Sequence, residues 1–230
     1  MDGAPENWNS TVAPPGVRAS RSGRPAAGPP AATPAAALQR RTPIPPPVPA
    51  PNRVRIIGGR HRGRQIRVPD APGLRPTPDR VRETLFNWLG QDLTGARTLD
   101  LYAETGILTL EACSRGAVLA VALDRNAALI RALLTAAQTM GIGAIETHVA
   151  DALAWAAREA RSFDVIFADP PFAEDPWPAL FDRAARLLAP QGRLYAEAGR
   201  MLTPPPGLSI VRHAKAGQVH YHLLALATPP

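Results

Sequence analysis

The sequence predicts an α/β fold built on a doubly wound, mostly parallel sheet. From about residue 95 onward, short apolar runs rich in β-branched residues alternate with longer segments of helical periodicity. Strands are expected at 98–102, 118–123, 145–149, 163–168 and 193–197, and helices at 106–114, 126–139, 152–160 and 177–188. Two further strand-like runs, 208–212 and 219–226, have no helix between them. Such runs form a hairpin, so the last strand should be antiparallel.

The composition predicts one ordinary domain with an appendage and a long extension. The chain has 230 residues, 45% of them hydrophobic, and its 27 prolines are concentrated in the first fifty positions. We expect residues 1–51 to be a disordered extension rich in Pro, Ala and Arg. The alternative, an organelle targeting peptide, is disfavoured because prolines break the amphipathic helix that it needs. Residues 52–94 would form the appendage and residues 95–228 the sheet domain.

The charge favours a polyanionic partner. The net charge is +7 and arginine supplies nearly all of the cations, which favours nucleic acid because a guanidinium binds phosphates and stacks on bases. Cys113 is the single cysteine, so an internal disulfide and a cysteine-based zinc cluster are excluded. The sequence also has no apolar run long enough to span a bilayer. We therefore expect a cytoplasmic protein without membrane contact.

An arginine-rich segment precedes the sheet domain. Residues 53–68 alternate apolar and basic side chains around Gly58, Gly59 and Gly63, which predicts a small β-hairpin. Almost no acidic residue interrupts it, so we expect its outer face to contact phosphates; a solvated charged face is the alternative. The arginines on this face are Arg55, Arg60, Arg62, Arg64 and Arg67.

A helix is predicted to follow the hairpin. Thr77 supplies a capping hydroxyl, Pro78 suits the first helical position, and Asp79 is an acid in the first turn. Gly90 ends the helix. By spacing alone, Thr77 and Arg82 would simply be exposed.

The segment Asp169-Pro170-Pro171-Phe172 carries the clearest chemical signal. It follows the apolar run 163–168, so it lies at the carboxyl end of a strand, where open α/β sheets bind ligands. Two prolines make a rigid turn, in which the Asp169 carboxylate and the Pro170 carbonyl face one spot beside an aromatic ring. Two such acceptors orient the exocyclic amine of a base, and Phe172 stacks on that base. The alternative is an ordinary turn at the end of a strand.

Four segments together resemble the RsmD family, the S-adenosylmethionine-dependent 16S ribosomal RNA guanine-N2 methyltransferases of bacteria. They are 55–59, 74–89, 169–172 and 217–219, and the resemblance covers residues 53–227. It implies a class I S-adenosylmethionine-dependent methyltransferase fold, which is Rossmann-like, preceded by the small N-terminal hairpin and helix. It also implies S-adenosyl-L-methionine as cofactor and 16S ribosomal RNA, or a small-subunit assembly particle, as partner. We further expect a monomer.

The resemblance also implies a set of cofactor residues. The helix after the hairpin should lie over the cofactor, and the turn 100–106 should approach it through backbone amides. Asp151 matches the family position whose residue contacts the adenine amine. A role as the cap of the following helix would explain Asp151 equally well. The implied cofactor residues are Thr77, Arg82, Asp100, Gly106, Asp124, Asp151 and Ala152.

The cofactor motif departs from the family pattern Asp-x-Phe-Ala-Gly-(Ser/Thr)-Gly. Glu104 replaces the first glycine, whose freedom at positive φ a glutamate lacks, and Thr109 replaces a later glycine. Ala122 stands where the family has the acid that binds the ribose hydroxyls. Asp124 faces the same way two residues on and could substitute for it.

The sequence thus predicts methyl transfer to a guanine N2 in 16S ribosomal RNA. Two alternatives stay open: a non-catalytic RNA-binding relative, for which the altered cofactor motif argues, and a DNA adenine-N6 methyltransferase, which would share the Asp-Pro-Pro-Phe chemistry. We expect no metal site, because His148, His213, His220 and His222 show no ligand spacing with a third partner.

Overall fold

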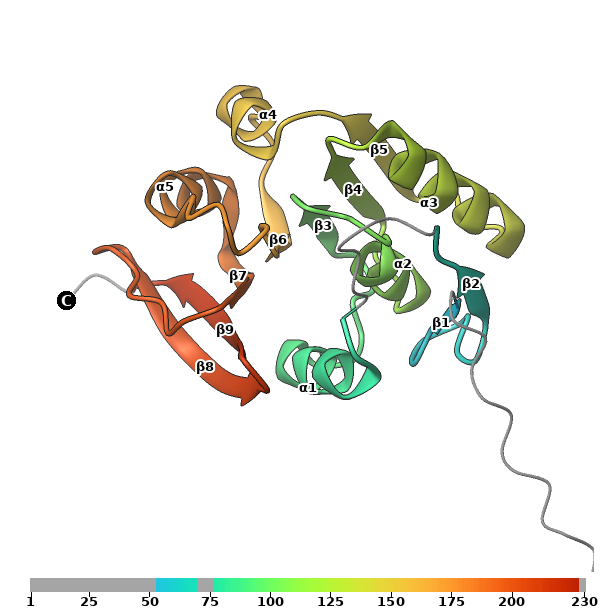
Figure 1. Ribbon diagram of the computed structural model, residues 1–230, viewed down its shortest axis with the longest axis horizontal. Coiled ribbons are helices and arrows are strands. Elements are labelled where there is room, and N and C mark those ends of the chain that lie inside the picture. The colour runs from blue at the N-terminus through green and yellow to red at the C-terminus, as the bar shows by residue number, and fades with distance from the viewer. Residues whose placement is uncertain (1–52, 70–76, 228–230) are drawn as a thin grey trace, which may run out of the picture. The chain divides into compact units, whose positions relative to one another are not determined.

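The structure, a computed structural model, describes residues 53–69 and 77–227 (Figure 1). The chain divides into residues 1–46 and 47–230, and every described residue belongs to the second unit. The predicted extension at 1–51 therefore lies outside the described residues.

A seven-stranded sheet forms the centre of this unit, in the order β5-β4-β3-β6-β7-β9-β8. All its described neighbours pair in parallel except those of β9, which runs antiparallel to both β7 and β8. The predicted parallel sheet with a reversed last strand is confirmed. The strands are β3 (Arg97–Asp100), β4 (Leu119–Asp124), β5 (Ile145–Val149), β6 (Phe163–Ala168), β7 (Leu188–Ala198), β8 (Leu208–Ala216) and β9 (Val219–Leu226).

Helices cover both faces of the sheet (Figure 1). On one side lie α1 (Asp79–Leu89), α2 (Ile107–Ser114) and α3 (Ala127–Met140), and on the other α4 (Ala152–Arg158) and α5 (Trp177–Leu187). Within β6, Val165 and Phe167 join the core under α1 to α3, while Ile166 and Ala168 join the core under α4 and α5. A strand buried on both faces reads as a continuous apolar run, as this one does. No helix among the described residues is long and apolar enough to cross a membrane.

The predicted hairpin forms from β1 (Arg53–Arg55) and β2 (Gln65–Arg67). Val54 and Ile66 point inward and belong to the same core as the apolar face of α1, so the appendage and the sheet share one core. Gly59 lies at φ 72, and a Cβ there would stand 1.9 Å from the Ser114 carbonyl oxygen. Only glycine permits the hairpin to approach the end of α2 this closely.

Three local predictions need correction. Helix α1 starts at Asp79 with Pro78 as N-cap, so Thr77 lies one residue too early for its hydroxyl to cap the helix, and no side-chain cap forms. The Thr77 carbonyl accepts the Arg82 Nε–H at 3.1 Å. Arg82 is fully buried rather than exposed. Strand β7 begins at Leu188, where it already pairs with Phe163, and not at 193. Gly90 ends α1 in the left-handed conformation, as predicted.

Candidate active site

Carboxylates from several strands meet at one edge of the sheet. Asp100 and Asp124 are the last residues of β3 and β4. Ala168 of β6 pairs with Ala196 of β7, so Asp169 and Glu197 come next to each other one residue further on. The carboxyl ends of parallel strands share an edge, which explains why residues so distant in sequence meet here.

Burial raises the pKa values of Asp100, Glu104 and Asp169. It raises the pKa of Asp100 to about 7, against the opposing hydrogen bond from the Thr109 hydroxyl at 2.7 Å. Burial, followed by the charges of Asp124 and Asp100, raises the pKa of Glu104 to about 7. The pKa of Asp169 is raised well above its usual range by burial and then by Glu197, Glu104 and Asp100.

Glu197 is a site residue that the sequence analysis missed. Burial raises the pKa of its carboxyl, while the Tyr195 hydroxyl donates a hydrogen bond to it at 2.7 Å and opposes that shift. Its signal was available, since Glu197 ends the predicted strand next to the one that precedes Asp169. Among the described residues, no arginine or lysine forms an ion pair with Asp100, Glu104, Asp169 or Glu197. We call these four residues the carboxylate cluster.

The turn between β3 and α2 holds Glu104 in a left-handed backbone conformation. Glu104 has φ 46, which is left-handed and is strained by roughly 1–2 kcal/mol for a residue with a Cβ. Its N–H donates to the Asp124 carboxylate at 2.9 Å, which holds the turn. Gly106 is also left-handed, and a Cβ there would stand 2.4 Å from Leu133 Cδ1. This glycine therefore serves the packing of α2 against α3.

The two candidate ribose positions differ in accessibility. Ala122 is fully buried in the core. Asp124 accepts the Glu104 N–H through one oxygen and the Asn126 N–H, at 2.7 Å, through the other. Each oxygen retains a free lone pair, so a ribose contact by Asp124 stays a prediction.

Asp151 caps α4, the alternative left open by the sequence. Its Oδ1 accepts the Ala154 N–H at 2.8 Å and its Oδ2 accepts the Arg125 Nε–H at 3.0 Å. The Ala154 N–H, and then Arg125, hold the pKa of Asp151 below its usual value. Ala152 is buried in the first turn of α4. An adenine contact by Asp151 and Ala152 stays a prediction.

The Asp-Pro-Pro-Phe turn exposes the Phe172 ring, while Pro170 is buried. The Pro171 carbonyl closes the turn by accepting the Glu174 N–H at 2.8 Å. Among the described residues, no donor is bonded to the Pro170 carbonyl. Phe172 is 54% exposed and lies against Gly199, where an added Cβ would stand 3.7 Å from Phe172 Cδ2. An acceptor and an exposed ring thus stand beside Asp169.

Two predicted cofactor residues, Thr77 and Arg82, take part in a network of hydrogen bonds within the protein. The Arg82 guanidinium donates to Glu111 and to Asp79, each at 2.5 Å, and to the backbone of Arg55 and Thr77. Because all of these partners are protein groups, Arg82 joins the hairpin, α1 and α2. Arg82 and the Thr77 carbonyl belong to this network, and a cofactor contact by either residue stays a prediction.

The five hairpin arginines are exposed, as expected. Arg55 pairs with Asp79 at 3.0 Å, whereas Arg60, Arg62, Arg64 and Arg67 form no ion pair with any residue that the structure describes. RNA contact by these arginines stays a prediction.

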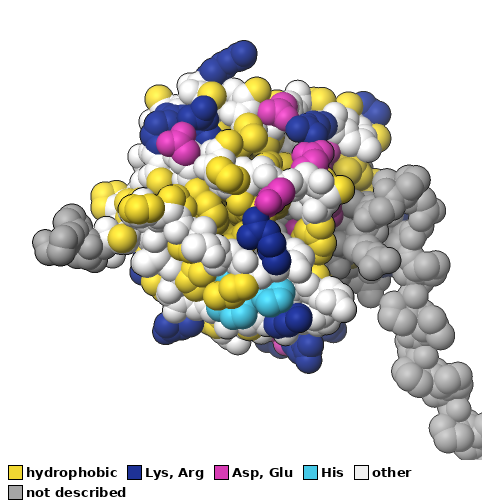
Figure 2. Space-filling view, turned by 60° about the vertical axis from the view of Figure 1, so that its left-hand side comes forward, with side chains coloured by type: hydrophobic (Ala, Val, Ile, Leu, Met, Phe, Trp, Pro, Cys, Tyr) yellow, Lys and Arg dark blue, Asp and Glu magenta, His cyan; other side chains and the backbone are white. Residues whose placement is uncertain are grey.

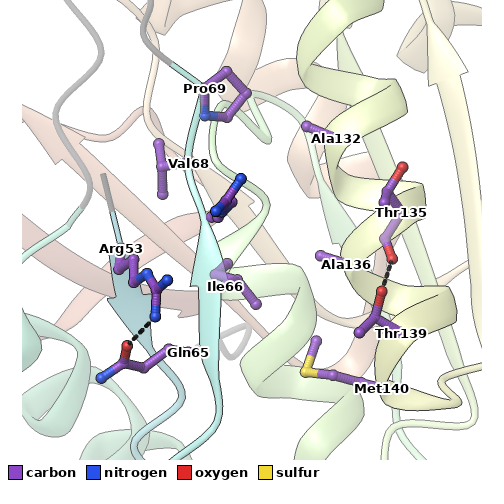
Figure 3. A pocket seen from close by; sticks show the side chains of 11 residues that line it. Arg53, Gln65, Ile66, Val68, Pro69, Ala132, Thr135, Ala136, Thr139 and Met140 are labelled. Carbon is purple, nitrogen blue, oxygen red and sulfur yellow. Dashed lines mark hydrogen bonds between the residues drawn. The ribbon is translucent and has the colours of Figure 1, made fainter. Parts of the chain in front are cut away.

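A groove of about 740 Å³ between β2 and α3 lies near this surface (Figure 3). Arg53, which bonds Gln65 at 3.3 Å, and Arg67 line it together with Ile66 and Met140. None of the catalytic or cofactor candidates lines the groove, so the site at the sheet edge is separate from it.

The absence of a histidine cluster was predicted wrongly. His213 of β8 pairs across the strands with His222 of β9, and His220 lies two residues from His222 on the same face. One ligand atom from each of the three lies within 4.8 Å of those of the other two. The spacing in sequence did not reveal this group because strand pairing, not the local period, creates it.

Comparison with known proteins identifies the family. Residues 54–225 match the family described as "Conserved hypothetical protein 95". Ribosomal RNA small subunit methyltransferase D of Escherichia coli strain K12 is 38% identical over 179 residues, which cover 74% of this chain and 88% of that protein. The chain belongs to the RsmD family. The relative of the same name from Haemophilus influenzae is 33% identical over 186 residues, or 76% of this chain and 94% of that protein.

Solved structures agree with the RsmD assignment. The Escherichia coli protein yhhF matches with a TM-score of 0.70 and 36% identity over 77% of this chain and 100% of that one. A methylase from Haemophilus influenzae matches with a TM-score of 0.62 and 30% identity over 75% and 98%. The predicted class I methyltransferase fold is thereby confirmed.

Proposed function

We propose that this protein transfers a methyl group from S-adenosyl-L-methionine to the exocyclic N2 of a guanine in 16S ribosomal RNA. The observation that carries the proposal is the position of Asp169 near the exposed Phe172, directly after the carboxyl end of β6 in an RsmD-family fold. The named relatives are small subunit ribosomal RNA methyltransferases, which supports RNA methylation. The guanine N2 as the target atom is proposed from the resemblance to the RsmD family.

The proposed chemistry is catalysis by orientation. The base leaves its stack and packs on Phe172. The Asp169 carboxylate and the Pro170 carbonyl accept the two amine hydrogens, which aims the nitrogen lone pair at the methyl carbon. When bound, the cofactor would supply the methyl group to the amine nitrogen, and Asp169 would take the surplus proton from that nitrogen and release it to water. No covalent enzyme intermediate is required.

The carboxylate cluster fits a positively charged cofactor. Asp100, Glu104, Asp169 and Glu197 are largely buried and have no cationic partner among the described residues. When bound, the cofactor supplies the methyl group on a cationic sulfonium. A cation beside these groups would lower their pKa values, which favours the ionised Asp169 that accepts hydrogen bonds.

Two departures from the family pattern, Glu104 in the turn and Ala122 in β4, should weaken cofactor binding. Asp124 and Asp151 are the remaining acids that we propose for ribose and adenine contact, while Asp100 and Gly106 shape the turn. Losing one hydrogen bond to a charged group costs about 1.5–3 kcal/mol, so cofactor affinity should be roughly tenfold to a hundredfold lower than in relatives that have the ribose acid.

Mapping of modified nucleosides in 16S RNA tests the function. RNA from a strain without the gene should lack N2-methylguanine at one position, as measured by mass spectrometry. The wild-type gene should restore it and an Asp169→Ala gene should not. Unchanged 16S modification would refute the proposal. A change in DNA N6-methyladenine would support the DNA alternative, and no change in any nucleic acid would favour a non-catalytic relative.

A further inference from the structure

We propose that His213, His220 and His222 form a binding site for a divalent transition-metal ion of the zinc type. The three imidazoles lie on one face of the β8–β9 hairpin, and their ligand atoms lie within 4.8 Å of one another. Nitrogen ligands of this kind suit zinc, copper and nickel ions. Strand β9 pairs with β7, where His222 stands opposite Ala196, the residue before Glu197 of the carboxylate cluster. Successive residues of a strand face opposite sides of the sheet, so the histidines and Glu197 lie on different faces.

Two of the imidazoles are already close to ligand spacing. His213 Nε2 and His220 Nδ1 are 3.1 Å apart and share a proton in a hydrogen bond. Two nitrogens that bind one zinc ion at about 2.0–2.1 Å in tetrahedral geometry are separated by a similar distance. The nitrogen separation therefore suits an ion, but the two rings are stacked at 19° to each other, so both must rotate before their lone pairs converge on it.

The third imidazole, that of His222, is held in place by a hydrogen bond to the neighbouring strand β7. His222 is fully buried, and its Nδ1–H donates to the Ala196 carbonyl at 3.2 Å. This bond leaves Nε2 without a proton. Histidines that bind metals commonly donate their other ring N–H to a backbone carbonyl in the same way. Nε2 accepts the Leu202 N–H at 3.3 Å, a long bond that must be exchanged when the ion binds. We therefore expect affinity in the micromolar range and not the tight binding of a preformed structural site.

Access and neighbouring charge are compatible with an ion. His213 is exposed and His220 is partly exposed, so an ion can enter from solvent and retain a water as its fourth ligand. Figure 2 shows histidine side chains gathered in one surface patch beside hydrophobic side chains. Lys215 lies opposite His220 across the strands and is the nearby cation that the site must tolerate.

The test uses the full chain with any histidine tag removed and measures Zn²⁺ binding by calorimetry. We expect one ion per chain and a higher melting temperature with Zn²⁺. His213→Gln and His220→Gln, both at accessible positions, should each weaken binding by at least roughly tenfold and leave the metal-free melting temperature nearly unchanged. His148→Gln, on β5, is the matched control and should bind like the wild type.

Cobalt provides a second measurement that separates this site from others. Co²⁺ bound by three imidazoles and a water should give visible absorption of tetrahedral character, which the double variant of His213 and His220 should lose. No saturable binding of Zn²⁺ to the wild type would overturn the proposal. Equal binding by the double variant would overturn it too, because it would assign the ion to other ligands such as the carboxylate cluster.

Discussion

Two regions of this protein bury charged side chains, with opposite arrangements. In the Arg82 network, Glu111 is fully buried between Arg82 and Arg115 and also accepts the N–H groups of Ile57 and Gly58. In the carboxylate cluster, acids stand next to acids, and the described residues supply no cation. The first region satisfies each charge and fastens the hairpin to the sheet. The second leaves negative charge uncompensated where the ligand is expected.

The contrast separates structural charges from functional ones. Burial raises the pKa of Glu111, but its hydrogen bonds and both arginines oppose that shift. For Asp169 the neighbouring charges add to the effect of burial. Strongly perturbed pKa values without a partner are typical of functional sites, which commonly sacrifice some stability. Substitutions in the two regions should therefore move stability in opposite directions.

The largest expected effect is on stability in the Arg82 network. Arg82→Met would leave Glu111 without its closest cation, and breaking a buried pair by removing one partner costs about 3–5 kcal/mol. Urea denaturation should show this loss in the free energy of unfolding. Arg80→Met, on the exposed side of α1, is the control and should change stability by less than about 0.5 kcal/mol. An equal loss of unfolding free energy in both variants would show that burial of the Arg82–Glu111 pair does not cause the effect.

In the carboxylate cluster, Asp169→Asn should reduce activity without reducing stability. The amide removes an ionisable acceptor, so single-turnover methyl transfer should fall by roughly 10²–10³-fold. Because the substitution also relieves repulsion from Glu197, the free energy of unfolding should stay level or rise. Asp182→Asn on the surface of α5 should alter neither quantity. Normal turnover by the Asp169 variant would place the amine elsewhere.

Glu104 should make stability depend on pH. Its carboxyl has an ordinary pKa of 4.5 and a pKa of about 7 in the folded protein. The folded state therefore holds the proton longer than the unfolded state, so stability is greatest below the lower value and falls as pH rises through the higher one. Glu104→Gln should remove this loss and stabilise the protein by on the order of 2 kcal/mol at about pH 8.

The same substitution should have little effect at about pH 4.5, where the carboxyl is protonated in the folded state. Thermal denaturation across this range, with Glu83→Gln on exposed α1 as the control, measures the difference. A stabilisation of equal size at both ends of the range would mean that relief of charge is not the cause.

The smallest effect is expected on the basic surface of the hairpin. Replacing Arg60, Arg62 and Arg64 by Gln should weaken RNA binding and flatten its dependence on salt. The log–log slope should fall by roughly 0.7–0.9 for each RNA phosphate that an arginine no longer neutralises. Binding measured at several salt concentrations gives this slope.

The control for the hairpin replaces three exposed arginines that lie elsewhere, Arg131, Arg158 and Arg212, and so removes the same net charge. It should leave the slope closer to that of the wild type. Equal slopes in the two triple variants would indicate that only total charge matters and that the hairpin has no direct RNA contact.

Local signals in the sequence determined the elements and part of the site. The apolar run at 163–168 and the proline pair after it predicted a buried strand and the position of Asp169, because both depend on neighbouring residues. Gly90 marked the end of α1 for the same reason. The motif shared with the RsmD family supplied the fold and the kind of chemistry.

Tertiary structure alone decided which distant residues meet. Arg82 reads as an exposed helix residue, yet Glu111 and the hairpin bury it. Glu197 becomes a neighbour of Asp169 only through the register of β6 and β7, and His213 meets His222 only through that of β8 and β9. The alternation of residues along a strand predicts which face of the sheet a side chain lies on. It does not predict which residue lies opposite on the next strand, because strand pairing joins segments that are far apart in the sequence.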